Sequence, residues 1–316
     1  IFETTATGPS GEKIKTKWGA LGDNKTAVIE MAKISGLALL NRNKLKPHKY
    51  STYGMGEIIK ECLDYGFNNF IIGIGGSATN DGGLGMAEAL GAILKDKNNK
   101  QIKRGIKGLS SLSTIDLRDI DKRIYNSSFQ IACDVNNPLY GPNGATYIFG
   151  PQKGFNSDEI KLIDSYMKNY GNLIDSISKK EISKHPGSGA AGGIGAAAMY
   201  FLNAKLKSGS EIILDYLDFA KHCENIDLII TGEGQMDFQT INNKAPIAVA
   251  RIAQKYKIPV FAICGILGKD YQKVYKEGIK KIYPLCVNEK EIEFAINNAG
   301  KLIAENAYQI IKDNFI

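Results

Sequence analysis

The side chains most able to do chemistry gather in one glycine-rich stretch, residues 75–83, which reads Gly-Gly-Ser-Ala-Thr-Asn-Asp-Gly-Gly. Glycine has no Cβ, so several backbone N–H groups can converge on one anion there. Hydroxyl, amide and carboxylate groups alternate with these glycines, which favours a site that binds phosphate and holds reacting groups beside it. The alternative is an ordinary turn in which Asn80 or Asp81 caps the next helix, and for any residue taken alone that alternative is favoured.

The elements around this stretch have the order of a parallel α/β sheet. Apolar residues recur at helical spacing over 55–63, and Gly66 follows as a C-cap. The apolar run 70–74 predicts a buried strand that leads into the glycines, and a helix is expected after them. Helix, strand, turn and helix in this order are typical of a parallel sheet, with the positive end of the second helix facing the turn.

A dinucleotide-binding turn is the first alternative for this stretch. Gly73, Gly75 and Ala78 match the dinucleotide fingerprint, and Asp96 follows as its acidic residue. Asp96 lies in a lysine-rich segment, however, and does not end a second strand. An NAD-dependent oxidoreductase therefore remains an alternative with weak support.

Two further carboxylates stand at the ends of apolar runs. Asp134 follows the predicted strand 129–133, and ligands of open α/β sheets bind beyond the carboxyl ends of strands. A turn-forming aspartate before Pro138 is an equally good interpretation. Glu30 interrupts the apolar run 27–32, where it either faces an edge or points into a site, and we favour the site.

The last third of the chain repeats strands and helices in regular order. The expected elements are strand 226–230, turn 231–237, helix 246–256, strands 258–264 and 282–286, and a final helix. Right-handed crossovers would make these strands parallel. One edge of the sheet would then carry Glu233, Asp237, Thr240 and Lys244.

Composition excludes several classes of protein. The chain has 316 residues, 43% of them hydrophobic, which is enough for two globular domains. Its apolar runs are too short to span a bilayer and no export signal opens it, so we expect a soluble cytoplasmic protein without a membrane partner. The net charge of +7 is dispersed, and the densest basic patch, 95–104, has no aromatic residue, which argues against nucleic acid. Five cysteines without a CxxC pair and three isolated histidines give little support for zinc.

Taken together, these motifs resemble the type 1 glycerate kinase family, which phosphorylates glycerate from ATP. The segments that carry the resemblance occur in the family's order along nearly the whole chain: 27–32, 73–82, 132–138, 149–154, 187–193, 231–237, and 239–246 with Gln239, Thr240 and Lys244. The resemblance implies two α/β domains, one flavodoxin-like with a parallel sheet and one inserted into it. We place the inserted domain at 1–225 and the C-terminal part of the flavodoxin-like domain at 226–316.

The family normally begins with a strand, a lysine- and serine-bearing loop, a helix and a second glycine-rich acidic turn, all of which would precede Ile1. We therefore expect a truncated chain whose activity needs that segment, and a catalytically inactive ligand-binding fragment remains an alternative. No GxxxxGK[ST] run or protein-kinase motif set is present. The family does not use these motifs, so their absence does not weaken the resemblance.

The resemblance implies D-glycerate as substrate, phosphorylated preferentially at its 2-hydroxyl, with ATP and Mg²⁺ as cofactors; a homodimer is a further expectation. Phosphoryl transfer needs charge neutralisation, a metal and an acceptor for the hydroxyl proton. Asp81, Asp134 and Asp237 are expected to share the metal and base roles, with Asp237 as base and Asp81 and Asp134 on the metal. Lys244 would offset phosphoryl charge. The phosphate would be held by Gly75, Gly76, Ser77, Thr79 and Asn80, and glycerate by Glu30, Ser35, Lys153 and Glu233.

Overall fold

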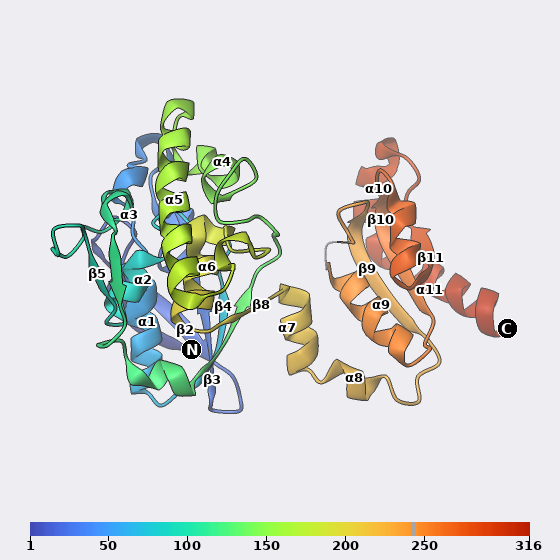
Figure 1. Cartoon of the computed structure of the whole chain (residues 1–316). Coiled ribbons are helices and arrows are strands. Elements are labelled where there is room, and N and C mark those ends of the chain that lie inside the picture. The colour runs from blue at the N-terminus through green and yellow to red at the C-terminus, as the bar shows by residue number, and fades with distance from the viewer. Residues whose placement is uncertain (242–243) are drawn as a thin grey trace. The chain divides into compact units, whose positions relative to one another are not determined.

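The computed structural model of the chain describes residues 1–241 and 244–316, which form two compact units, 1–207 and 208–316 (Figure 1). The division falls earlier than the boundary at 225/226 expected from the sequence. Helix α7 (Gly209–Tyr216) packs on α9 (Ala245–Lys255), and this contact joins residues 208–225 to the second unit. Within the described residues, no helix is both long and apolar enough to cross a bilayer.

The first unit is built on a six-stranded sheet with the order β1-β2-β3-β4-β7-β8. Its strands are β1 (Phe2–Thr7), β2 (Lys13–Ala20), β3 (Thr26–Glu30), β4 (Asn69–Gly73), β7 (Ser128–Ala132) and β8 (Lys205–Lys207). The pairs from β3 to β8 are parallel, whereas β1–β2 and β2–β3 are antiparallel. The α/β class and its parallel sheet are thus confirmed, with an antiparallel hairpin added at one edge.

Six α-helices of this unit lie in the described residues. They are α1 (Tyr53–Asp64), α2 (Leu84–Ala89), α3 (Ile106–Ser111), α4 (Ala145–Phe149), α5 (Ser157–Ser178) and α6 (Ala190–Phe201). Of these, α1 and α2 are the two expected before the central strand and after the glycine turn. A separate antiparallel pair joins β5 (Ile93–Lys95) to β6 (Thr114–Asp116). Helix α5 begins with a capping box, in which the side chains of Asn156 and Glu159 each accept from the other residue's N–H, so its start is fixed locally.

The register of the central strands determines where a site can form. Glu30, Gly73 and Ala132 are paired across β3, β4 and β7, so the carboxyl ends of three parallel strands stand side by side. Phe70 of β4 stacks on Phe129 of β7 with ring centroids 4.5 Å apart, and both rings are buried. This aromatic pair stabilises the registration of the two strands that carry the glycine turn and Asp134.

The second unit has a parallel three-stranded sheet with the order β11-β10-β9. Its elements are β9 (Ile229–Met236), β10 (Val260–Leu267), β11 (Ile279–Pro284), α7, α8 (Phe219–His222), α9, α10 (Ile292–Asn297) and α11 (Ala299–Phe315). The prediction of a turn at 231–237 is wrong, because β9 continues through Met236 by pairing with β10. Gly265 allows this pairing, since a Cβ there would lie 2.5 Å from the Gly234 carbonyl oxygen.

The close packing of the glycine turn on α6 in the first unit can be tested at Gly83. Its φ is +73°, and a Cβ would lie 2.3 Å from Ala197 Cβ. Gly83→Ala should lower the free energy of unfolding of the first unit by about 2–5 kcal/mol, from left-handed backbone strain and overpacking. Gly66→Ala is the control, because its φ is +89° in open space, and it should lower the same free energy by only about 1–2 kcal/mol.

The measurement is urea unfolding followed by tryptophan fluorescence. Trp18 is the only tryptophan and is buried in the first unit, so the signal reports that unit alone. Equal losses for the two variants would contradict the close packing of Gly83 on Ala197.

Candidate active site

The glycine turn after β4 is fixed by backbone contacts with the segment that follows β3. Leu37 N donates to Gly76 O (2.9 Å), and Ala78 N donates to Ser35 O (2.9 Å). Gly76 has a φ of +70°. Among the described residues, the N–H groups of Gly76 and Ser77 have no hydrogen-bond acceptor. The turn therefore presents two adjacent unpaired donors, as anion-binding backbone nests do.

A pocket of about 220 Å³ opens at this turn, and we call it the glycine-turn pocket. Its walls come from the ends of β4 and β7, from the turn that follows α4, and from the start of α6. It is lined by Ile74, Gly75, Gly76, Ser77, Ala132, Cys133, Asp134, Val135, Phe149, Gln152, Lys153, Ala190 and Ala191. The structure thus brings together five of the residues expected at the site: Gly75, Gly76, Ser77, Asp134 and Lys153.

Lys153 is the buried cation of the glycine-turn pocket. It ends a short 3₁₀ turn, Pro151–Lys153, and its side chain is 1% exposed. Its Nζ donates to Ser77 Oγ (2.9 Å) and to the Thr79 carbonyl oxygen (2.7 Å). Burial lowers the pKa of Lys153 from its usual 10.5 to about 7, against the opposing charge of Asp81. The lysine therefore joins the 149–154 segment to the glycine turn and places a titratable cation beside it.

Asp81 lies beneath the turn and is fully buried. Its Oδ2 accepts from Thr52 N (2.8 Å), Thr52 Oγ1 (3.0 Å) and Gly85 N (3.3 Å), and its Oδ1 accepts from Gly83 N (3.1 Å). Burial raises the pKa of this carboxyl, and the hydrogen bonds from Thr52, Gly83 and Gly85 oppose that rise. Asp81 does not line the glycine-turn pocket. Both its oxygens are used to hold the turn against the starts of α1 and α2.

Thr79 and Asn80 are also fully buried below the pocket. Asn80 Nδ2 donates to Thr146 Oγ1 at 3.0 Å. The second glycine motif, 187–193, packs on this layer: Gly82 N donates to Gly192 O (3.0 Å), and a Cβ on Gly192 would lie 2.1 Å from the Thr79 carbonyl oxygen. Close packing thus accounts for the glycines of the second motif, while Ala190 and Ala191 from its end line the pocket.

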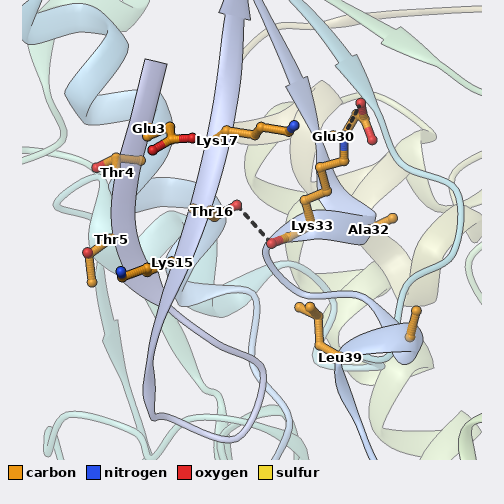
Figure 2. Close-up of a pocket in the computed structure, with 11 residues that line it drawn as sticks. Glu3, Thr4, Thr5, Lys15, Thr16, Lys17, Glu30, Ala32, Lys33 and Leu39 are labelled. Carbon is orange, nitrogen blue, oxygen red and sulfur yellow. Dashed lines mark hydrogen bonds and ion pairs between the residues drawn. The ribbon is translucent and has the colours of Figure 1, made fainter. Parts of the chain in front are cut away.

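A second, larger pocket of about 700 Å³ contains Glu30, and we call it the hairpin pocket (Figure 2). It is lined by Glu3, Thr4, Thr5, Lys15, Thr16, Lys17, Glu30, Ala32, Lys33, Ala38 and Leu39. Glu30 Oε1 pairs with Lys33 Nζ at 3.0 Å, and both side chains are largely exposed. Ala32 separates the two pockets, because its Cβ is 3.3 Å from the position that a Cβ of Gly76 would occupy. Ser35 is buried, with its Oγ 3.5 Å from the Ser51 carbonyl oxygen.

The remaining predicted site residues belong to the second unit. Glu233 lies within β9, where its Oε1 accepts from Gly234 N (3.1 Å). Asp237 follows β9, and its Oδ1 accepts from Gln239 N (2.8 Å) and Thr240 N (3.2 Å). Lys244 is the N-cap residue of α9. The gathering of Asp81, Asp134 and Asp237 around one phosphate stays a prediction, and within each unit the described residues include no group of three metal-ligand side chains.

Comparison with known proteins identifies the family. Residues 1–314 match the glycerate kinase family. The glycerate kinase of Bacillus subtilis (strain 168) is 41% identical over 310 residues, which are 98% of this chain and 81% of that protein. The chain belongs to the glycerate kinase family. The glycerate 2-kinase of Escherichia coli (strain K12) is 45% identical over 293 residues, which are 93% of this chain and 77% of that protein.

The fold agrees with this assignment. A crystal structure from Salmonella typhimurium LT2 that carries the designation glycerate kinase 2 matches with a TM-score of 0.80 at 38% identity, covering 99% of this chain and 82% of that one. Glycerate kinase family membership confirms the resemblance found in the motifs and supports the kinase over the NAD-dependent oxidoreductase. Asp96, the acidic residue of that alternative, instead closes its own loop by accepting from Asn98 N (2.8 Å) and Lys100 N (2.9 Å).

The glycine-turn pocket contains two polar residues that the sequence analysis does not name. Cys133 and Gln152 line the glycine-turn pocket, and each adjoins a residue that was singled out, Asp134 or Lys153. Adjacency was the only signal for them in the sequence. Burial raises the pKa of the Cys133 thiol, so this side chain contributes a neutral wall.

The pKa of Lys153 predicts how stability depends on pH. The unfolded chain binds this proton with a pKa near 10.5, whereas the folded chain releases it near 7. Between these values the unfolded state binds more protons, so the free energy of unfolding of the first unit should rise with pH. The rise should reach at most about 1.4 kcal/mol per pH unit between about pH 7.5 and 9. Urea unfolding followed by Trp18 fluorescence measures it.

Lys153→Met keeps an unbranched apolar side chain and removes the titrating group. This variant should lose the rise in stability above about pH 7. A wild-type stability that is flat or falls over this range, with no difference from Lys153→Met, would contradict the lowered pKa.

Proposed function

We propose that the chain catalyses ATP-dependent phosphorylation of D-glycerate at the 2-hydroxyl. The family match over residues 1–314 and the 45% identity to the E. coli protein named glycerate 2-kinase support the substrate and the position. The observation that carries the proposal is the glycine-turn pocket, where unpaired N–H groups and the Lys153 cation meet at the carboxyl ends of parallel strands. Such a pocket suits an anionic phosphoryl group.

The two pockets suggest a division of the substrates within the first unit. Gly75, Gly76 and Ser77 would hold the phosphoryl group in the glycine-turn pocket, through backbone N–H groups and the Ser77 hydroxyl. Glu30 would accept a hydrogen bond from a glycerate hydroxyl in the adjoining hairpin pocket, where it lies at the carboxyl end of β3. Ala32 of the hairpin pocket lies beside Gly76 of the glycine-turn pocket, so the two substrates would bind on neighbouring sides of this contact.

The residues of the pocket fit a magnesium ion bound mainly through ATP. Mg²⁺ commonly uses one or two carboxylates together with substrate phosphates and water. Asp134, at the end of β7 and in the pocket wall, would supply the protein carboxylate. Asp81 does not fit as a ligand, because both its oxygens already accept buried hydrogen bonds, and we assign it the holding of the turn. When bound, Mg²⁺ neutralises the charge of the phosphates.

We assign the role of proton acceptor to Asp237. As the glycerate oxygen bonds to the γ-phosphorus and the bond to the ADP oxygen breaks, the hydroxyl proton would pass to Asp237. Asp237 Oδ1 is held by Gln239 N and Thr240 N, whereas Oδ2 accepts no hydrogen bond from a described residue. Oδ2 is therefore the oxygen free to take the proton. Lys244 would offset phosphoryl charge, and Glu233 would contact glycerate.

A phosphorus NMR assay with ATP, Mg²⁺ and D-glycerate tests the activity and its position. We expect signals of ADP and 2-phosphoglycerate, with no product when glycerate is omitted. The assay should be run on this chain and on a version that carries the upstream segment typical of the family. Calorimetric glycerate binding without phosphoryl transfer in either version would instead support a ligand-binding protein, and 3-phosphoglycerate as the only product would contradict the position.

Asp237→Asn tests the proton acceptor, because the amide keeps the acceptor oxygen that binds Gln239 N but cannot take a proton. Its kcat should fall by about 10³-fold, while the KM for ATP changes little. Asp270→Asn is the matched control on an exposed aspartate of the same unit, which pairs with Lys273, and it should leave kcat unchanged. A near-normal kcat for Asp237→Asn would remove Asp237 from the reaction.

A further inference from the structure

Lys153 has one N–H donor in the glycine-turn pocket that makes no hydrogen bond to a described residue. An ammonium group has three N–H bonds, and this one uses two of them, on Ser77 Oγ and on the Thr79 carbonyl oxygen. Both acceptors are neutral. Lys153 forms no ion pair with a carboxylate of the described residues. A cation that is 1% exposed and lacks a counter-charge is unfavourable unless an anion joins it.

The charged and titratable groups around Lys153 do not supply this counter-charge. Asp81 acts on it from below the turn, but the Asp81 oxygens are occupied by Thr52, Gly83 and Gly85. Asp134 and the neutral thiol of Cys133 stand in the pocket wall on the end of β7.

The glycine turn adds backbone donors to the pocket that Lys153 lines. Ser77, which accepts from Lys153 Nζ through its Oγ, belongs to the turn whose Gly76 and Ser77 N–H groups are unpaired among the described residues. Three donors with one positive charge are the recognition pattern of an oxyanion.

We propose that Lys153 is the oxyanion-recognition residue of the glycine-turn pocket, and that an oxyanion binds to its third N–H and to the N–H groups of Gly76 and Ser77 with uptake of a proton. The oxyanion is a phosphoryl group of the nucleotide or the carboxylate of glycerate, which share this chemistry. The inference rests on the proposed function and names the residue that would determine its specificity for anions.

Proton uptake follows from the state of Lys153 before the ligand binds. Because its pKa is about 7 in the empty pocket, the amine is largely neutral above that pH. A bound oxyanion favours the ammonium form and raises the pKa, so binding draws a proton from solution. Affinity should therefore be highest below pH 7 and fall with rising pH, by at most about tenfold per pH unit.

The test on the wild-type chain is isothermal titration calorimetry at about pH 8, in two buffers of different ionisation enthalpy. One arm uses D-glycerate alone, and the other uses Mg²⁺ with a non-hydrolysable ATP analogue. Uptake of about half a proton or more in one arm identifies the oxyanion bound by Lys153. Binding without proton uptake in both arms would overturn the proposal, and this result does not depend on whether any variant folds.

Three variants separate recognition from a structural role. Lys153→Met should lose proton uptake and about 100-fold in kcat/KM for the substrate that showed it. Lys153→Arg carries a permanent positive charge, so it should bind the ligand without proton uptake by residue 153. Any proton uptake that comes from the ATP analogue itself should remain in this variant, which therefore serves as the control. Lys161→Met, on the exposed face of α5, should behave as wild type.

Unchanged affinity and unchanged proton uptake in Lys153→Met would assign the uptake to another group and overturn the inference. Binding and turnover are read separately. Uptake that depends on Lys153 in a chain that never forms phosphoglycerate would support this inference while the proposed function fails. Turnover of glycerate that is insensitive to Lys153→Met would do the reverse.

Discussion

The buried carboxylate of Asp81 is the interaction on which the candidate site depends. One side chain accepts from Thr52, Gly83 and Gly85, so it joins the starts of α1 and α2 to the glycine turn that follows β4. A carboxylate without such donors would be too costly to bury, and the backbone donors of the turn would lose their acceptor. Because Asp81 holds residues 81–85 in place, the N–H groups of Gly76 and Ser77, which have no acceptor among the described residues, can face a ligand.

The two glycine motifs, 75–83 and 187–193, pack directly against each other. Gly192 and Gly193 approach the backbone of Thr79 and Gly82 so closely that a side chain on either would collide with it. Lys153 adds a third segment, and its ammonium binds the turn from the pocket side. Segments that are far apart in the sequence therefore build one small pocket, which is why the family's motifs extend over most of the chain.

The sequence predicted the elements that local pattern controls and missed what pairing and burial control. Strand, glycine turn and helix near residue 75 followed from apolar periodicity, and the order of motifs identified the family. The run 231–237 looked like a turn because of its glycines, yet pairing with β10 extends it as a strand. The sequence predicts a metal or base role for Asp81, and this role stays a prediction; what the sequence does not reveal is that Thr52 and the two helix starts surround this carboxylate with donors. Asp237 lies in the second unit, and its role stays a prediction.

The contact between the two glycine motifs also limits how the site can move. Carbonyl oxygens and Cα atoms of 79–82 and 192–193 are in contact without intervening side chains, so this part of the turn is closely packed on both sides of the contact. Preorganised dipoles stabilise charge without reorganising during the reaction. If the proposed phosphate site is right, its donors at Gly76 and Ser77 belong to a turn whose later residues, 79–82, are already anchored before any nucleotide arrives.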